Sequence, residues 1–242
     1  MLPVMALGFL VFTGITNYGI FILAVMTYYQ VVISGSSVLI GTVIGWARYK
    51  KIDNSALPFI ICLTVASANE IISFMMTLNR CDTAYNNNIY VLLEALLIVW
   101  QFRKWQLLNR YSYLFPVIML AIVIAWIIEN VLFAGSASIK SYCRIFYALV
   151  IVLMSIHVNN ELILTFKKKL FKSPVFLICA GFIIYFTFKI LVESFWLYGL
   201  SASKSFRNNV YLMLVWINLF VNLIYAFALL WMPRRPQYIK LC

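Results

Sequence analysis

The chain has 242 residues, of which 64% are hydrophobic and only 11% are charged. Its mean hydropathy of +0.95 lies outside the range of soluble domains, in which about a quarter of residues are charged. This composition excludes a soluble domain and predicts an all-α, polytopic bundle of transmembrane helices. The formal net charge of +12 is explained by membrane topology and by anionic headgroups, so a nucleic-acid partner is not expected.

The first 47 residues contain no charged side chain. As one helix they would be about 70 Å long, roughly twice the thickness of a hydrocarbon core. Two spans at about 4–27 and 31–47, with a turn near 28–30, fit this length better. A cleaved signal peptide is the rival interpretation, but the segment lacks a basic n-region and an A-x-A cleavage site.

From Arg48 onward, apolar runs alternate with charged connectors. Run length and flanking polar residues predict six more spans. They cover about 56–78, 88–102, 113–134, 141–164, 173–198 and 208–232. The sequence therefore predicts one transmembrane domain over 1–242 with eight helices, or seven as the alternative, and no soluble domain.

The distribution of basic residues predicts the orientation. Thirteen Lys and Arg residues lie in one set of alternating connectors, and five lie in the other. Because basic residues stay in cytoplasmic loops, the C-terminus is expected on the cytoplasmic side, and the protein is expected in the cell membrane. One basic run is a candidate contact for anionic lipid or for a cytoplasmic protein. It consists of Lys167, Lys168 and Lys169.

Five of the seven acidic residues fall inside predicted spans. A charge at this depth costs at least a few kcal/mol, so it normally faces the bundle interior or a wet cavity. Four of them share the predicted outer half, namely Glu70, Glu94, Glu129 and Glu193. Asn69 and Asn130 adjoin two of these glutamates, and Asn218 and Asn222 lie four residues apart on the last span, near mid-membrane. Together these residues predict an outward-opening, acidic intramembrane cavity.

Lys189 is the only basic residue that is expected to be buried within a predicted span. It precedes Glu193 by four residues, so the two side chains are expected on one helix face as an ion pair. Two interpretations remain open. The pair is a permanent structural bridge, or Lys189 is a counter-charge that is released when a ligand binds.

His157 and Glu161 are also four residues apart, near the predicted inner end of their helix. Such a pair is either a proton relay near neutral pH or an interfacial cap. No metal-binding motif such as CxxC or HExxH is present, and neither a metal nor a cofactor is expected. Enzymatic chemistry is not expected either, because no Ser or Cys lies near a second His.

Ser37, Gly41 and Gly45 recur every four residues and form a stripe of small side chains. Such a stripe serves close packing of helices, either within one chain or in a homo-oligomer. Cys81 and Cys143 both fall at the predicted outer face. They either form a disulfide, if their Cα atoms come within about 7 Å, or remain two unrelated free thiols.

Two segments resemble each other: ENVLFAGSASIKSYCR, which starts at Glu129, and ESFWLYGLSASKSFR, which starts at Glu193. The likeness suggests repeated helical hairpins, an arrangement common in transporters. Short polar loops also resemble each other by chance.

These patterns predict an integral membrane channel or transporter for a cation or a small cationic solute, with the four outer glutamates lining its vestibule. The alternative is a ligand-sensing or partner-regulated membrane module, such as a receptor, that binds without transport.

Overall fold

The computed structural model describes residues 29–105, 113–132, 141–165, 173–197 and 204–233. Within these ranges every regular element is helical, as the composition predicts. The predicted span 4–27 and the lysines at 167–169 lie outside the described residues. Most of both loops of the suggested repeat also lie outside them, so the repeat stays a prediction.

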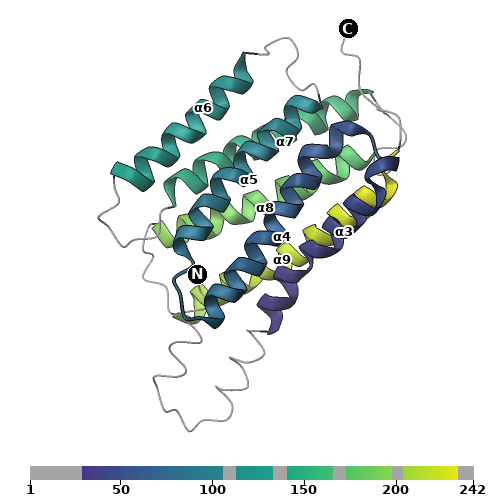
Figure 1. The fold of residues 1–242 in the computed structure, drawn as a ribbon. Coiled ribbons are helices and arrows are strands. Elements are labelled where there is room, and N and C mark those ends of the chain that lie inside the picture. Colours follow the sequence, from purple (N-terminus) through teal and green to yellow (C-terminus); the bar gives the residue numbers. More distant parts are fainter. Residues whose placement is uncertain (1–28, 106–112, 133–140, 166–172, 198–203, 234–242) are drawn as a thin grey trace.

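The described part of the chain contains seven α-helices, which lie side by side along a common direction (Figure 1). They are α3 (Val38–Arg48), α4 (Leu57–Leu78), α5 (Ala84–Lys104), α6 (Leu114–Ile127), α7 (Tyr142–Thr165), α8 (Pro174–Leu197) and α9 (Lys204–Trp231). The short helices η1 (Tyr49–Lys51) and η2 (Asn54–Ala56) connect α3 to α4, and η4 (Ile128–Leu132) is a π-helix that continues α6.

Five helical segments are long and apolar enough to cross a membrane, by length and composition. They are Tyr29–Lys51, Asn54–Leu78, Tyr142–Leu164, Pro174–Phe195 and Asn209–Trp231. Each coincides with a predicted span to within a few residues. These apolar helices are compatible with a membrane protein, whereas the total of eight spans and the orientation stay predictions.

The predicted spans 88–102 and 113–134 are helical but fall outside this set. In α5 the apolar run is bounded by three asparagines at 86–88 and by Arg103 and Lys104 at the other end. The apolar segment Leu114–Asn130, which covers α6 and part of η4, is too short to count among the five membrane-length helices. Both helices nevertheless pack into the same bundle.

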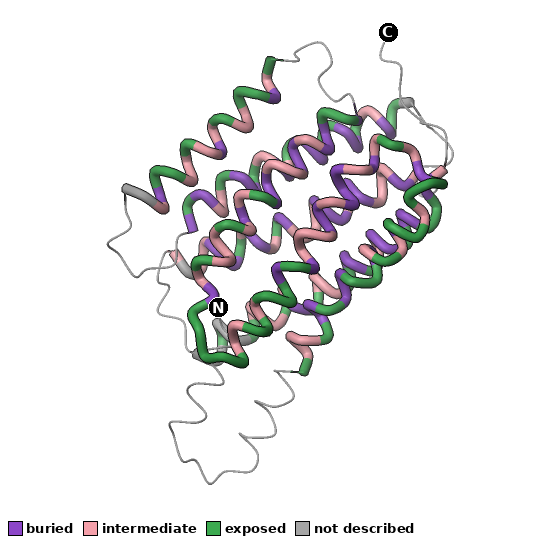
Figure 2. The backbone as a smooth tube through the Cα atoms, in the orientation of Figure 1, coloured by how far each residue is buried: buried purple, intermediate pink, exposed green. Residues whose placement is uncertain are grey.

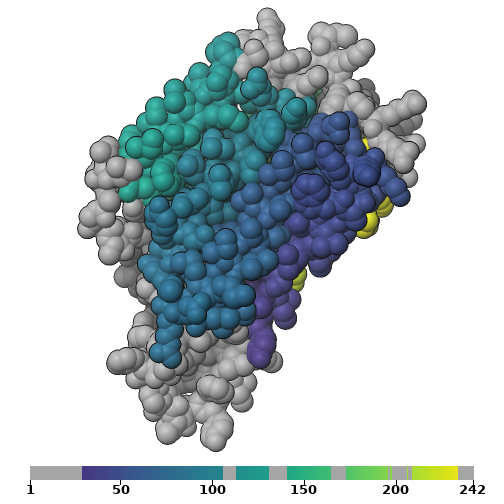
Figure 3. Space-filling model, viewed as in Figure 1, coloured from purple at the N-terminus to yellow at the C-terminus, as the bar shows by residue number. Residues whose placement is uncertain are grey.

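Six helices form a closed ring. Each contacts the next in the order α3, α4, α5, α7, α8, α9, and α9 contacts α3 again. The remaining helix, α6, packs on the outside against α5 and α7, and Figure 1 shows it at the edge of the bundle. In the space-filling view, the side chains of α4, α5 and α6 form a continuous surface (Figure 3).

Aromatic side chains fill the centre of the ring. Phe59 of α4 contacts Tyr225 of α9 and Phe182 of α8 edge to face, with ring centroids 5.2 and 5.9 Å apart. Edge-to-face contacts are the favoured geometry for such rings. Buried and exposed stretches alternate along the helices, as the colours of the backbone tube show (Figure 2). The exposed residues include large apolar side chains such as Val43, 66% exposed, and Leu120, 60% exposed, which fits contact with a lipid bilayer.

The small-residue stripe packs within the chain. A Cβ on Gly45 would lie 3.2 Å from Ile60 of α4 and 3.6 Å from Leu229 of α9. Because these glycines lack side chains, α3 comes close to both neighbouring helices, as the intramolecular interpretation predicts. Ser37 completes the stripe by accepting a hydrogen bond of 2.9 Å from Asn222 of α9.

Buried polar groups and turn geometry define both ends of α4. At its start, the Oε1 atom of Gln101, a fully buried residue, accepts a 2.8 Å hydrogen bond from the Phe59 amide, one of the donors that a helix start leaves unpaired. At its end, Arg80 adopts a positive φ of 56°. The Cys81 amide then donates 2.8 Å back to the Met76 carbonyl, which is the Schellman pattern of helix ends.

Candidate functional site

A cavity of about 510 Å³ lies at the end of the bundle where α4 ends and α5 begins, the predicted outer end. Its walls come from α4, α5, α8 and α9, together with the start of α3 and the helical turns at 29–36 that precede it. The polar part of the lining consists of Ser34, Ser36, Ser67, Asn69, Glu70, Ser73, Thr77, Thr83, Asn87, Tyr185, Tyr211 and Asn218.

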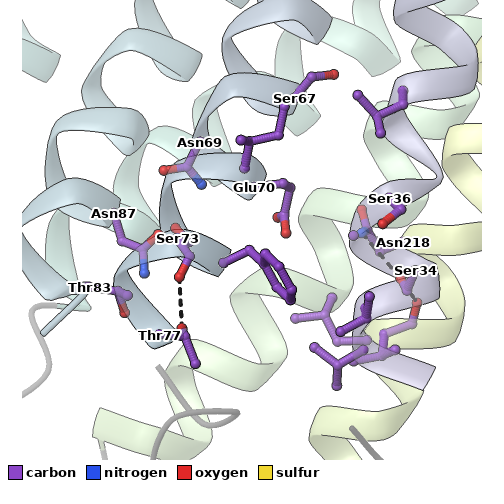
Figure 4. A pocket seen from close by; sticks show the side chains of 18 of the residues that line it. Ser34, Ser36, Ser67, Asn69, Glu70, Ser73, Thr77, Thr83, Asn87 and Asn218 are labelled. Carbon is purple, nitrogen blue, oxygen red and sulfur yellow. Dashed lines mark hydrogen bonds between the residues drawn. The ribbon is translucent and has the colours of Figure 1, made fainter. Parts of the chain in front are cut away.

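Glu70 is the one charged residue among the described residues that line this cavity. Its carboxylate lies over the backbone of Gly35, where a Cβ would be only 2.5 Å from Oε2. In Figure 4 the carboxylate points into the space between Asn87 and Ser73 on one side and Ser34, Ser36 and Asn218 on the other. No hydrogen bond or ion pair joins Glu70 to another described residue. The cavity therefore contains a negative charge that these residues do not compensate.

The neighbouring hydroxyl and amide groups hold the cavity walls together. On one wall, Asn86 of α5 donates hydrogen bonds of 2.8 Å to Asn69 Oδ1 and 3.2 Å to Ser73 Oγ, both of α4. On the other, Asn218 of α9 donates 3.3 Å to Ser34 Oγ, and Ser34 Oγ donates 2.6 Å to the Val215 carbonyl. The cavity is thus formed between two helix pairs, each joined by its own hydrogen bonds.

Glu94 of α5 is the centre of a separate, buried network. Its Oε1 accepts a hydrogen bond of 2.8 Å from Tyr90, and its Oε2 accepts one of 2.8 Å from Tyr147 of α7. Lys189 of α8 places Nζ 3.0 Å from the same Oε2. The Lys189 ammonium also lies 5.2 to 5.4 Å from the ring centroids of Tyr147, Tyr185 and Phe186, within the range of cation–π attraction.

The predicted ion pair between Lys189 and Glu193 is wrong. Lys189 binds Glu94 instead, while Glu193 is bound by Arg144, 3.1 Å away, and by the Ser141 hydroxyl, both near the start of α7. The i,i+4 rule describes neighbours on one helix surface. Here that surface of α8 faces other helices, and a carboxylate of α5 and a guanidinium of α7 satisfy the two charges across the interface.

Glu129 has a third role. Its Oε1 and Oε2 accept hydrogen bonds of 3.0 and 2.7 Å from the amides of Tyr142 and Cys143, at the start of α7. A carboxylate at this position pairs the free amides and complements the helix dipole. The described cavity therefore contains one of the four predicted vestibule glutamates, not four, because Glu94, Glu129 and Glu193 each bind partners elsewhere.

Of the four predicted amide side chains, two line the cavity and two bind partners elsewhere. Asn69 and Asn218 line the cavity. Asn222 lies one turn further along α9 and binds Ser37, and Asn130 donates 3.0 Å to the Trp126 carbonyl of its own helix. Only the first two are therefore cavity residues.

The remaining predicted groups lie apart from the cavity lining. His157 and Glu161 do form a pair, with Nε2 and Oε1 3.3 Å apart and the His side chain 46% exposed. A relay at this place stays a prediction. Cys81 is exposed and Cys143 is buried, and both are free thiols, so the predicted disulfide is not formed. No cluster of metal ligands occurs among the described residues.

Several residues of these sites were not foreseen from the sequence, among them Gly35, Tyr90, Arg144 and Tyr147. Tyr90 lies four residues before Glu94, and this helical spacing was a signal that could have found it. The other three act across helices, and no local pattern marks them.

Comparison of the chain with known protein families, with curated proteins and with solved structures finds no significant match. The cavity around Glu70 is therefore the feature from which a function is inferred.

Proposed function

We propose that the protein is an integral membrane channel or transporter for a cation or a small cationic solute, and that Glu70 is the carboxylate that binds it. The supporting observation is the contrast between Glu70 and the glutamates at 94, 129 and 193. Each of those three has compensating partners, whereas Glu70 faces a cavity and has none among the described residues.

The electrostatics of the site favour a cation. A carboxylate in a low-dielectric helix bundle is costly unless it is paired. A cation in the cavity would supply the missing charge, since neither Lys nor Arg is among the described residues that line it. Lys189 does not compete for this role, because Glu94 neutralises it.

The packing below the cavity supports a site that is open on one side. Thr42 of α3 donates a hydrogen bond of 3.0 Å to the Leu63 carbonyl of α4, and its hydroxyl lies 2.8 Å from that of Ser67. These contacts hold α3 against α4 toward the predicted inner end. In the proposed mechanism the helix pairs on either side of the cavity rock against each other, which exposes the site alternately to the two faces.

The test is cation flux into liposomes that contain the purified protein, with labelled Na⁺ and labelled n-butylammonium as probes. Glu70→Gln keeps the shape of the side chain but removes its charge, so we expect uptake of the transported probe to fall by about tenfold or more. Asp82→Asn is the matched control. It removes a carboxylate from the exposed connector between α4 and α5, and Asn serves equally well at a helix start.

Uptake that is the same for Glu70→Gln and the unmodified protein would refute this role of Glu70. Binding of a probe without any uptake would favour the alternative, a sensing module.

A further inference from the structure

The size of the cavity bears on the kind of cation it binds. Its volume of about 510 Å³ falls in the range of pockets for small organic molecules, about 300–1,000 Å³. A dehydrated metal ion instead needs about six oxygen atoms at roughly 2.0–2.6 Å around one point. The Glu70 cavity is much larger than such a coordination sphere.

Many of the oxygen-bearing side chains of the lining already take part in hydrogen bonds within the protein. They are those of Ser34, Ser67, Asn69, Ser73, Thr77 and Asn218. The two oxygens of Glu70 are the charged acceptors that remain. They suffice for the head of an alkylammonium ion, which needs at most three acceptors, and a quaternary ammonium needs none.

Apolar and aromatic side chains also line the cavity. The rings of Phe74, Tyr185 and Tyr211 line it, together with aliphatic residues such as Leu39 and Leu214. Aromatic faces attract organic ammonium ions, and aliphatic walls favour a hydrocarbon substituent. Because Tyr185 also contacts Lys189, Phe74 and Tyr211 are the rings available to a ligand.

We infer that the Glu70 cavity binds a monovalent organic ammonium ion, with the charged head at the Glu70 carboxylate and the hydrocarbon part against Phe74 and Tyr211. This inference rests on the proposed function and narrows its ligand from cations in general to organic amines. The two parts of the ligand would thus contact different side chains of the lining, the charged Glu70 and the apolar and aromatic residues.

The test measures binding to the purified full-length chain in nanodiscs by titration calorimetry, at constant ionic strength. The probes are n-butylammonium, n-butanol, which has the same carbon chain without the charge, and Na⁺. We expect saturable binding of n-butylammonium, and no saturable binding of n-butanol or Na⁺. Glu70→Gln should weaken it by about tenfold or more, the factor expected for losing a charge-assisted hydrogen bond.

Two further variants test the geometry. Gly35→Ala places a methyl group where the Glu70 carboxylate now lies, so it should also weaken n-butylammonium binding while leaving the charge in place. Phe74→Leu removes a ring from the cavity and should weaken binding several-fold. Phe220→Leu is the matched control, because Phe220 is 56% exposed on α9 and is not among the lining residues.

The outcomes separate this inference from the proposed function. Glu70-dependent binding of Na⁺ without binding of n-butylammonium would overturn the organic ligand but leave cation transport intact. Glu70-dependent binding of n-butylammonium without flux in liposomes would support the ligand and refute transport. If Glu70→Gln does not fold, unchanged binding by both Gly35→Ala and Phe74→Leu would overturn the site.

Discussion

Lys189 brings a positive charge into the middle of α8, and two neighbouring helices compensate it. Glu94 of α5 supplies the counter-charge, and Tyr147 of α7 supplies both a hydroxyl donor to that carboxylate and an aromatic face. The side chains of Lys189 and Glu94 are only 11% and 7% exposed. A network of this kind is costly to break at one member, because the remaining charge stays buried without a partner.

We therefore predict that Lys189→Met strongly destabilises the protein. Methionine fills a similar volume but leaves the Glu94 carboxylate buried and uncompensated, a loss of about 3–5 kcal/mol in comparable cases. The double variant Lys189→Met, Glu94→Gln should recover most of this stability, since no buried charge remains and the Gln carbonyl still accepts hydrogen bonds from the tyrosines. Thermal unfolding of the purified variants in detergent measures both effects.

The same measurement distinguishes the two possible partners of Lys189. A double-mutant cycle should give a larger coupling energy for Lys189 with Glu94 than for Lys189 with Glu193. Stronger coupling to Glu193 would mean that the ion pair lies along α8, as the i,i+4 spacing suggests.

At the scale of elements, α3 packs closely against its neighbouring helices because two of its buried residues are glycines, which have no side chains. Gly41 and Gly45 are buried, and their faces lie against residues of α4 and α9. Close approach of this kind gives van der Waals packing and lets Thr42 reach the Leu63 carbonyl. The closure of the helix ring between α4 and α9 depends on this stripe.

We predict that Gly45→Val destabilises the bundle by about 1–3 kcal/mol, the usual cost of overpacking a well-packed interior. The first added carbon would already lie 3.2 Å from Ile60 and 3.6 Å from Leu229, and valine adds two methyl groups beyond it. Val43→Leu, on the exposed face of α3, is the control and should change the melting temperature little. Unchanged stability of Gly45→Val with loss of an oligomer in light scattering would instead assign the stripe to a contact between chains.

At the scale of the whole molecule, the local features of the sequence predicted local structure well. Run length and polar flanks located the helices, and the four-residue period identified the stripe of α3. Glu70 and Asn69, predicted in the outer half of their span, and Asn218, predicted near mid-membrane, line the same cavity.

The pairing of charges could not be predicted in the same way. Whether Lys189 meets Glu94 or Glu193 depends on how α8 is rotated toward α5 and α7, and this rotation is set by packing of the aromatic core rather than by spacing. Glu129 illustrates the same limit, because its depth resembles that of Glu70 while its position beside the start of α7 provides it with two backbone amides.

The orientation of the whole bundle can be tested through one thiol. Cys81 is exposed just after α4, whereas Cys62, Cys143 and Cys179 are buried. The distribution of basic residues predicts that Cys81 faces outward. In a Cys242→Ser background, a membrane-impermeant maleimide should therefore label intact cells that express the protein, and Cys81→Ser should abolish the labelling. Labelling only after permeabilisation would reverse the orientation and would place the mouth of the Glu70 cavity on the cytoplasmic side.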